Sequence, residues 1–454
     1  MFLPASGGAV AVAVQLVLLL ALIFCSKASA QNEHGSDYIG SSRPPLLKYQ
    51  ELVALGEQET VDPALAAKLH TLLTTPFVNN EAYFSGVKPI RPDLDGRGPS
   101  LRLVEWNIER GIEFDAIKLL LTDKQGFLAK VHSAAANNTN AEKTRDEVLD
   151  AQMDVLQSAE VLVLNEVDWG MKRSDYRAVA EDLADALKMN WAYGVEFVEG
   201  RTNLIATIDV PDLPGQQVTI VATHLENRTT PKGRVKEMDE ILDMVRPISH
   251  PVIIAGDMNT TGQDGSVLSI KSAALKKLNN PAFWATQGVK YATGVGVIMD
   301  VASFGFKTAK FQADPTASGV PLLAANPEQG LFKELNKYRF DDGTRIDFRG
   351  DAALSVNGRE GTLGNSNERA SKGFVTTFAL PRTLAALGKF RLDWIFVKGY
   401  LKDDPGAADS YRFAPAFART MNEANEALSN PLSDHASITV DLPIIQPALS
   451  GSKK

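Results

Sequence analysis

The chain has almost no cysteine. Cys25 is its only cysteine among 454 residues, and it lies within the first 30. If that segment is removed on export, the mature chain has none, so disulfides, zinc–thiolate sites and cysteine nucleophiles are excluded. An exported protein of this kind must be stabilised by its core and by any ions that it binds.

Basic residues are also few: 47 lysines and arginines face 55 acidic residues, for a formal net charge of −8. This balance argues against tight binding to a polyanion, because lysine and arginine contacts to phosphate supply most non-specific nucleic-acid affinity. It does not exclude a nuclease, which needs only a local basic rim and a metal ion. The length allows one large domain or two.

The first 30 residues resemble a signal peptide. Residues 8–24 are almost wholly apolar, and the following Ala28-Ser29-Ala30 offers an A-x-A cleavage site. Because no lysine or arginine precedes the apolar run, an uncleaved membrane anchor is the alternative. We therefore predict export to the periplasm or the extracellular space, with anchoring if the segment is retained.

Hydrophobic periodicity divides the remaining chain into an extension, a main domain and a tail. The extension is 31–99, with a linker and a helical pattern at 50–75. The domain is 100–445, with a long insert at about 261–390, and 446–454 is expected to be disordered. Strands are predicted at 101–106, 161–164, 204–210, 218–223 and 252–255, and helices within 113–157 and at 175–189, 231–244 and 266–278. A hairpin at 204–223 and the lack of strict βαβ order predict a mixed sheet architecture.

Five apolar runs end near polar groups suited to phosphate-ester chemistry, and a sixth segment begins with them. The segments are LRLVEWNIERG (101–111), VLVLNEVDWG (161–170), VTIVATHLENR (218–228), PVIIAGDMNT (251–260), RLDWIFVKG (391–399) and LSDHASITVDL (432–442). Their polar residues are Asn107, Glu166, His224, Asp257, Asn259, Asp393, Asp434 and His435. Each alone is more often a turn residue, a solvated strand end or a structural histidine. The ordered set predicts strand ends that converge on one rim.

Asn107 and Glu166 are the predicted metal ligands. A carboxylate, an amide oxygen and waters suit Mg²⁺, and Asp434 could add a second carboxylate to this ion or to another. The lack of cysteine, and only two histidines in the motifs, favour Mg²⁺, Mn²⁺ or Ca²⁺ over zinc.

The other motif residues suit proton transfer and phosphate binding. Asp257 and Asn259 point the same way in an extended chain, so they can orient a water nucleophile and hold a phosphoryl oxygen. His435 suits proton transfer near neutrality, and a carboxylate on its far nitrogen, for which Asp393 is the candidate, would fix its tautomer. His224 can donate to a phosphate oxygen and stabilise charge in the transition state.

Cationic residues near the motif ends form a candidate basic rim for the substrate. The predicted substrate contacts are Arg110 and Arg228, and further candidates are Arg173, Lys232, Arg234 and Lys236. Each alone is more often a solvated charge, whereas a clustered positive potential would favour a nucleic-acid or polyphosphate substrate.

The motifs WNIERG, NEV, THLE, GDMN, LDWIFV and SDH resemble those of the endonuclease/exonuclease/phosphatase superfamily, over about 100–442. The resemblance implies a four-layer α/β sandwich, with two packed mixed β-sheets flanked by helices, and Mg²⁺-dependent phosphoester hydrolysis at one rim. It implies metal binding by Asn107 and Glu166 and support of the metal or the histidine pair by Asp434. It implies positioning of water and phosphate by Asp257 and Asn259, orientation of His435 by Asp393, and a phosphate contact by His224.

One departure from the family pattern lies between Glu166 and His224. Family members usually carry a strand resembling G-N-A-I-L-S there, whereas residues 202–206 (TNLIA) are a degenerate echo. We interpret this as an internal deletion near 199–203, which could remove a strand pair and a carboxylate partner of His224.

Three functions remain open. The favoured one is an exported metal-dependent phosphodiesterase that acts on nucleic acid. The second is a lipid head-group phosphodiesterase or phosphatase, for which 283–288 and 374–381 are candidate membrane-facing loops, although core packing is the better interpretation of both. The third is an inactive binding protein, left so by the deletion. No protein partner is evident.

Overall fold

The structure is a computed structural model. It describes residues 41–57, 60–86, 91–94, 98–134, 139–195, 203–210, 213, 216–227, 229–260, 327–348, 376–379, 389–398, 415–417 and 420–444. Several predictions lie outside these residues: the signal peptide, most of the insert with its helix at 266–278, the loop at 283–288, Arg228, the region of the apparent deletion and the C-terminal tail. Within the described residues, none of the helices is both long and apolar enough to span a membrane.

Two mixed β-sheets form the centre of the fold. The first contains, in spatial order, β14 (Ala416–Phe417), β15 (Ile438–Pro443), β4 (Gly98–Asn107) and β3 (Asp93–Leu94), with β5 (Val161–Asn165) parallel to β4. The second contains β10 (Ile346–Asp347), β13 (Asp393–Lys398), β9 (Val252–Asp257), β8 (Gln217–His224) and β7 (Leu204–Asp209). β7 and β8 are antiparallel, which confirms the predicted hairpin, and β8 is parallel to β9.

The inner faces of the two sheets share one hydrophobic core. Alternate residues along each strand point to the same face. Leu103 and Val163 of the first sheet therefore pack against Ile253, Ile395 and their neighbours in the second. At the rim these apolar rows give way to the polar motif residues.

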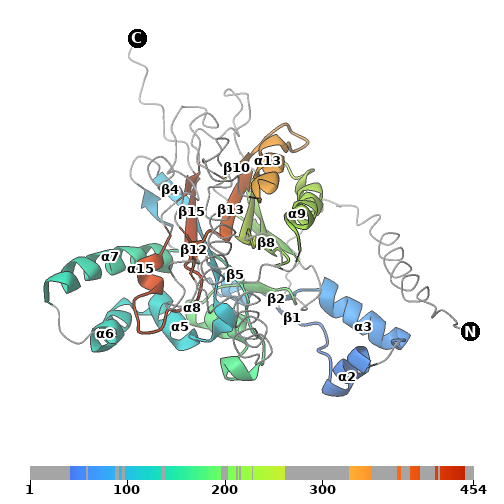
Figure 1. The fold of residues 1–454 in the computed structure, drawn as a ribbon, viewed down its shortest axis with the longest axis horizontal. Coiled ribbons are helices and arrows are strands. Elements are labelled where there is room, and N and C mark those ends of the chain that lie inside the picture. The colour runs from blue at the N-terminus through green and yellow to red at the C-terminus, as the bar shows by residue number, and fades with distance from the viewer. Residues whose placement is uncertain are drawn as a thin grey trace, which may run out of the picture. The chain divides into compact units, whose positions relative to one another are not determined.

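Helices cover the outer faces, which completes four layers (Figure 1). The first sheet packs against α5 (Phe114–Thr122), α6 (Lys124–Ala134), α7 (Thr139–Gln157), α8 (Val179–Leu187) and α15 (Asn422–Asn425). The second packs against α9 (Pro231–Val245) and α13 (Gln329–Lys337). The predicted sandwich of two mixed sheets flanked by helices is confirmed.

Where one helical pattern was predicted at 50–75 in the N-terminal extension, the structure has two helices. They are α2 (Tyr49–Glu57) and α3 (Pro63–Thr74), followed by the short α4 (Glu81–Phe84). The Asp62 side chain accepts from the N–H groups of Ala64 and Leu65, so α3 begins at the predicted start signal. A separate small sheet orders β1 (Ser41–Ser42), β2 (Phe77–Asn79) and β6 (Trp191–Tyr193).

One predicted boundary was wrong. The helix expected at 175–189 begins only at Val179. Asp175 and Tyr176 instead have positive φ angles of 55° and 59°, and a bridge between Trp169 and Ala178 closes the turn that contains them. Short elements complete the fold: η1 (Glu109–Gly111), η2 (Lys172–Ser174) and the pair β11 (Phe378–Ala379) and β12 (Lys389–Phe390).

Candidate active site

Strand register places the polar motif residues at one rim of the two sheets. Because β8 and β9 are parallel, His224 lies opposite Asp257, and the antiparallel pairing of β9 with β13 sets Asp257 opposite Asp393. These three residues form one row across the second sheet. In the first sheet, Asn107 at the end of β4 lies opposite Asn165 at the end of β5.

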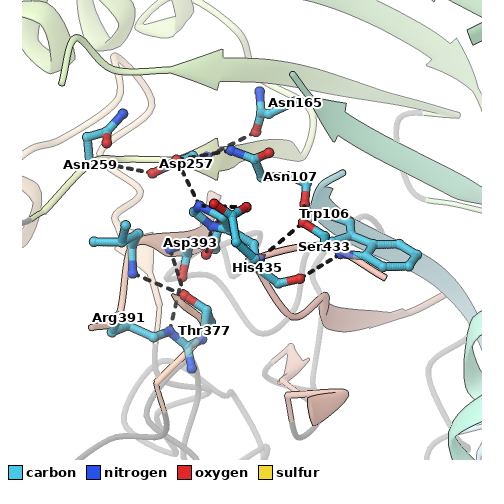
Figure 2. Close-up of polar contacts among 12 residues, drawn as sticks. Trp106, Asn107, Asn165, Asp257, Asn259, Thr377, Arg391, Asp393, Ser433 and His435 are labelled. Carbon is cyan, nitrogen blue, oxygen red and sulfur yellow. Dashed lines mark hydrogen bonds and ion pairs between the residues drawn. The ribbon is translucent and has the colours of Figure 1, made fainter. Parts of the chain in front are cut away.

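His435 lies between two aspartates (Figure 2). Its Nδ1 is 2.8 Å from Oδ2 and 3.0 Å from Oδ1 of Asp393, which is fully buried. Its Nε2 is 3.7 Å from Oδ2 of Asp257. The predicted pairing of His435 with Asp393 is therefore present in the structure.

The carboxylates around His435 favour its charged form. Burial alone would lower the pKa of this imidazole, but Asp393, Asp257 and Asp434 together outweigh burial and raise it well above its ordinary value of 6.5. At neutral pH this arrangement therefore favours an imidazolium, which donates protons and hydrogen bonds.

Thr377 and Phe378 support the histidine–aspartate pair, a role that no local sequence pattern predicts. The Thr377 hydroxyl accepts from the N–H groups of Leu392, at 3.1 Å, and Asp393, at 3.2 Å. The ring of Phe378 meets the imidazole edge-on, with centroids 4.8 Å apart. Both residues are buried, so in this part of 374–381 the core-packing interpretation is confirmed.

Asp257 is the centre of the site. Its Oδ2 lies 3.2 Å from Nδ2 of Asn107 and 3.6 Å from Nε2 of His224, while its Oδ1 accepts the N–H of Asn259 at 2.8 Å. β9 ends at Asp257 and Asn259 has a φ of 47°, so the two residues lie in a turn and not in the extended chain that was predicted. The Asn259 amide donates to the carbonyl of Leu225 at 2.7 Å, so it also fixes the loop that follows His224.

The predicted metal ligands lie beside Asp257 and His435, in a cluster of carboxylates: Oδ1 of Asp434 is 4.0 Å from Nε2 of His435. Nδ2 of Asn107 is 3.4 Å from Oε1 of Glu166, and the N–H of Asp434 donates to Oε2 of Glu109 at 3.2 Å. Burial and then the Asp434 carboxylate raise the pKa of Glu109. Burial, helped by Glu166 and Asp257, raises that of Asp434.

This cluster fits a divalent cation. A cation between the acids would offset the burial and the mutual repulsion that raise the two pKa values, and carboxylates with an amide oxygen are ligands that Mg²⁺ accepts. Asn107 would have to turn its oxygen toward such an ion, because its Nδ2 now faces Glu166 and Asp257. Glu109 was not singled out from the sequence, although it lies in the WNIERG motif.

A second group of residues could also hold an ion. Asp257, Asp393 and His435 each offer a ligand atom, and these atoms lie within 4.8 Å of one another. An ion there would compete with the hydrogen bonds between His435 and Asp393. The cluster around Glu166 leaves those bonds intact, so it is the better candidate for a metal that acts together with His435.

Asn165 and Ser433 link segments of the rim by hydrogen bonds, and Gly256 allows the backbone there to approach closely. Asn165 donates from Nδ2 to the carbonyl of Thr223, at 3.1 Å, and its Oδ1 accepts the N–H of Asp257, at 3.0 Å. Ser433 donates to the carbonyl of Asn107, at 2.6 Å, and accepts the N–H of His435, at 3.0 Å. Gly256 has a φ of 151°, and a Cβ there would lie 1.7 Å from the Thr223 carbonyl.

The predicted basic rim is smaller in the structure than in the sequence. Arg110 forms an ion pair with Glu166 at 3.4 Å, so it lies at the site. Arg173 forms two hydrogen bonds with Asp168, and half of its side chain stays exposed. Arg234 was assigned to the rim wrongly: it is fully buried and paired with Glu328.

A four-layer sandwich with a histidine–aspartate pair, a central aspartate and a cluster of oxygen donors at one rim defines a class of phosphoester hydrolases. The chain belongs to the Endonuclease/Exonuclease/phosphatase family, whose profile matches residues 104–435. Members of this family hydrolyse phosphoester bonds with divalent metal ions, in substrates such as nucleic acids. No curated protein matches the chain.

Several solved structures are similar to the chain at low identity. Truncated TDP2 of Caenorhabditis elegans is 14% identical, with 77% of this chain and 99% of that chain covered and a TM-score of 0.32. The endonuclease/exonuclease/phosphatase of Beutenbergia cavernae DSM 12333 is 15% identical, with 76% of this chain and 71% of that chain covered and a TM-score of 0.31. The human nocturnin catalytic domain is 13% identical, with 78% of this chain and 95% of that chain covered and a TM-score of 0.28. TM-scores this low carry no argument about substrate.

Proposed function

We propose that the protein is an exported, Mg²⁺-dependent phosphodiesterase that acts on nucleic acid. The observation that carries the proposal is the assembled rim. Asp257 lies within 3.7 Å of the imidazoles of both His224 and His435. Asp393 is hydrogen-bonded to Nδ1 of His435, and Asn107 lies between Asp257 and Glu166. A protein that only binds its ligand has no need of a buried histidine–aspartate pair.

Each residue has a distinct role in the proposed reaction. Glu166, Asp434 and Asn107 would hold the cation, which supplies charge neutralisation at the phosphate when bound. Asp257, fixed by the Asn259 N–H, orients the attacking water.

The two histidines face the phosphate and the leaving group. His435, kept protonated by its carboxylate neighbours, donates a proton or hydrogen bond as negative charge develops. His224 lies 3.6 Å from Oδ2 of Asp257, the same oxygen that faces His435, where it can donate to a second phosphate oxygen.

A polynucleotide is favoured over a lipid by two features. Arg110 and Arg173 place positive charge beside the acidic cluster, where a backbone phosphate next to the scissile one can bind. Phe378, from one candidate membrane loop, is buried against His435 and so is not available to a bilayer.

The test is nicking of supercoiled plasmid by the purified protein, with Mg²⁺, with EDTA, and with the variant His435→Ala. The matched control is His132→Ala, because His132 is a half-exposed helix residue paired with Asp146, on a different element from the site. We expect nicking by the wild type and His132→Ala, and loss of nicking in EDTA or with His435→Ala.

Two further substrates separate the alternatives. Hydrolysis of bis-p-nitrophenyl phosphate without plasmid nicking would support the proposed phosphodiesterase activity and refute the proposed nuclease activity. Hydrolysis of phospholipid vesicles alone would favour the lipid enzyme, and metal binding without any turnover would favour a binding protein. Export is tested separately: N-terminal sequencing of protein from the medium or periplasm should begin at Gln31.

A further inference from the structure

The loop that carries Glu166 needs support from its surroundings. Glu166 follows β5 directly and has a φ of 51°, a left-handed conformation that costs free energy in any residue other than glycine. Such a conformation persists only where neighbouring groups hold it. On its N-terminal side, Asn165 supplies two hydrogen bonds to the second sheet.

An aromatic cluster supports the loop on its C-terminal side. Tyr193 donates from its hydroxyl to the carbonyl of Val167, the residue after Glu166, at 3.0 Å. The ring of Trp169 lies 5.2 Å from that of Tyr193, 5.7 Å from that of Trp191 and 5.1 Å from that of Phe77. These four residues form the aromatic cluster.

The N-terminal segment 41–79 supplies part of this support. Phe77 lies on β2, pairs with Tyr193 across the small sheet, and stacks on its ring at 5.8 Å. Arg43 lies over the Trp169 ring at 5.7 Å and forms an ion pair with Glu181 of α8. All of these residues of 41–79 precede the family match, which begins at residue 104.

We propose that the aromatic cluster and segment 41–79 position Glu166, and thereby set the affinity of the site for its divalent cation. The inference rests on the proposed function, in which Glu166 is a metal ligand. Segment 41–79 is then a working part of the metal site, and it acts through the contacts of Phe77 and Arg43 with the aromatic cluster. Removing an outer support of a metal ligand typically weakens metal binding by about 10- to 100-fold.

The test compares two tyrosine-to-phenylalanine variants of the full chain. Tyr193→Phe removes only the hydroxyl that bonds the Val167 carbonyl. The matched control is Tyr338→Phe, which removes an equivalent bond to the carbonyl of Leu242, at 2.6 Å, in the helical layer of α9 and α13. Mn²⁺ affinity is measured by calorimetric titration, and thermal unfolding is followed in parallel.

We expect both variants to lower the melting temperature to a similar extent, while only Tyr193→Phe raises the Mn²⁺ dissociation constant, by about tenfold. Phe77→Leu, which changes the segment itself, should shift the dissociation constant in the same direction. At saturating metal, turnover by Tyr193→Phe should return close to the wild-type value.

Three results would overturn the inference in distinguishable ways. If wild-type protein binds Mn²⁺ and both Tyr193→Phe and Phe77→Leu bind it equally well, the positioning role is wrong and the proposed function stands. If the wild type binds no Mn²⁺, the metal-dependent function fails and this inference fails with it. Equal weakening by Tyr338→Phe would show a general loss of stability instead of a specific role.

Discussion

Glu105 is the side chain whose replacement we expect to stabilise the protein. It lies on β4, fully buried, two residues before Asn107 and on the same face of the strand. Within the described part of the chain, neither of its carboxyl oxygens has a hydrogen-bond partner. A buried polar group without a partner costs about 1–3 kcal/mol, and methionine fills a similar volume without polar atoms. Glu105→Met should therefore raise the free energy of unfolding by about 1–3 kcal/mol at pH 7.

The gain in stability from Glu105→Met should depend on pH. Burial, with Asp393 and Asp257 nearby, raises the pKa of Glu105 well above its ordinary value of 4.5. Above pH 4.5 the unfolded chain releases this proton while the folded protein keeps it. The contribution of Glu105 to stability is thus complete below pH 4.5 and is lost as the pH rises through the folded pKa. The advantage of Glu105→Met should therefore grow with pH over that window.

Urea unfolding of the wild type, Glu105→Met and Glu105→Gln at several pH values measures both effects. Glu105→Gln removes the titration but keeps an unpaired polar group. It should share the pH dependence of Glu105→Met with a smaller gain. If Glu105→Met is less stable than the wild type by more than 1 kcal/mol, with an unchanged m-value, the reasoning is refuted. Glu105 would then have a polar partner.

Three further predictions concern the rim. Gly256→Ala should destabilise the protein by about 4 kcal/mol or more, because the new Cβ would overlap the Thr223 carbonyl; an unfolding midpoint close to the wild type would contradict this. Asp393→Asn should lower kcat by about 10²- to 10⁴-fold with an unchanged circular dichroism spectrum, since the asparagine cannot stabilise the His435 imidazolium; a loss below tenfold would remove Asp393 from the mechanism. The pKa of His435 is raised well above 6.5, so its contribution to stability is complete below pH 6.5 and is lost as the pH rises from there through the folded pKa. In chelator, the stability of the wild type relative to His435→Gln should fall as the pH rises above 6.5, and a constant difference would show that the pKa is not raised.

The sequence predicts the rim well because its signals are local. A buried strand shows as a short apolar run, and the residue that ends the run falls at the sheet edge. Asn107, Asp257 and Asp393 lie at strand ends or starts as expected. Once the strands pair, their register alone brings these residues into one row. The capping signal at Asp62 is local for the same reason.

The residues that the sequence did not reveal act through distant partners. Arg234 has the pattern of an exposed helix residue, and only the packing of α9 against the residue that precedes α13 shows that Glu328 buries it. Thr377 follows a long segment with no recognisable pattern, yet it supports Asp393. Alternation along β4 places Glu105 on the same face as Asn107, but no local rule says what that face meets.

The geometry of the site depends on how the two sheets pack against each other. Asp257 and Asp393 belong to the second sheet, whereas Asn107 belongs to the first and Glu166 follows one of its strands. Asn165 joins the two sheets at the rim, and beneath it a cluster of apolar side chains sets most of their spacing. Displacements of about 1 Å can lower a reaction rate by about 10²-fold. Small changes in this core should therefore lower the catalytic rate, although the core side chains do not contact the substrate. Glu105 lies in the same interface, near the carboxylates of Asp393 and Asp257 and at a cost in stability. Its presence indicates that the spacing there is not optimised for stability alone.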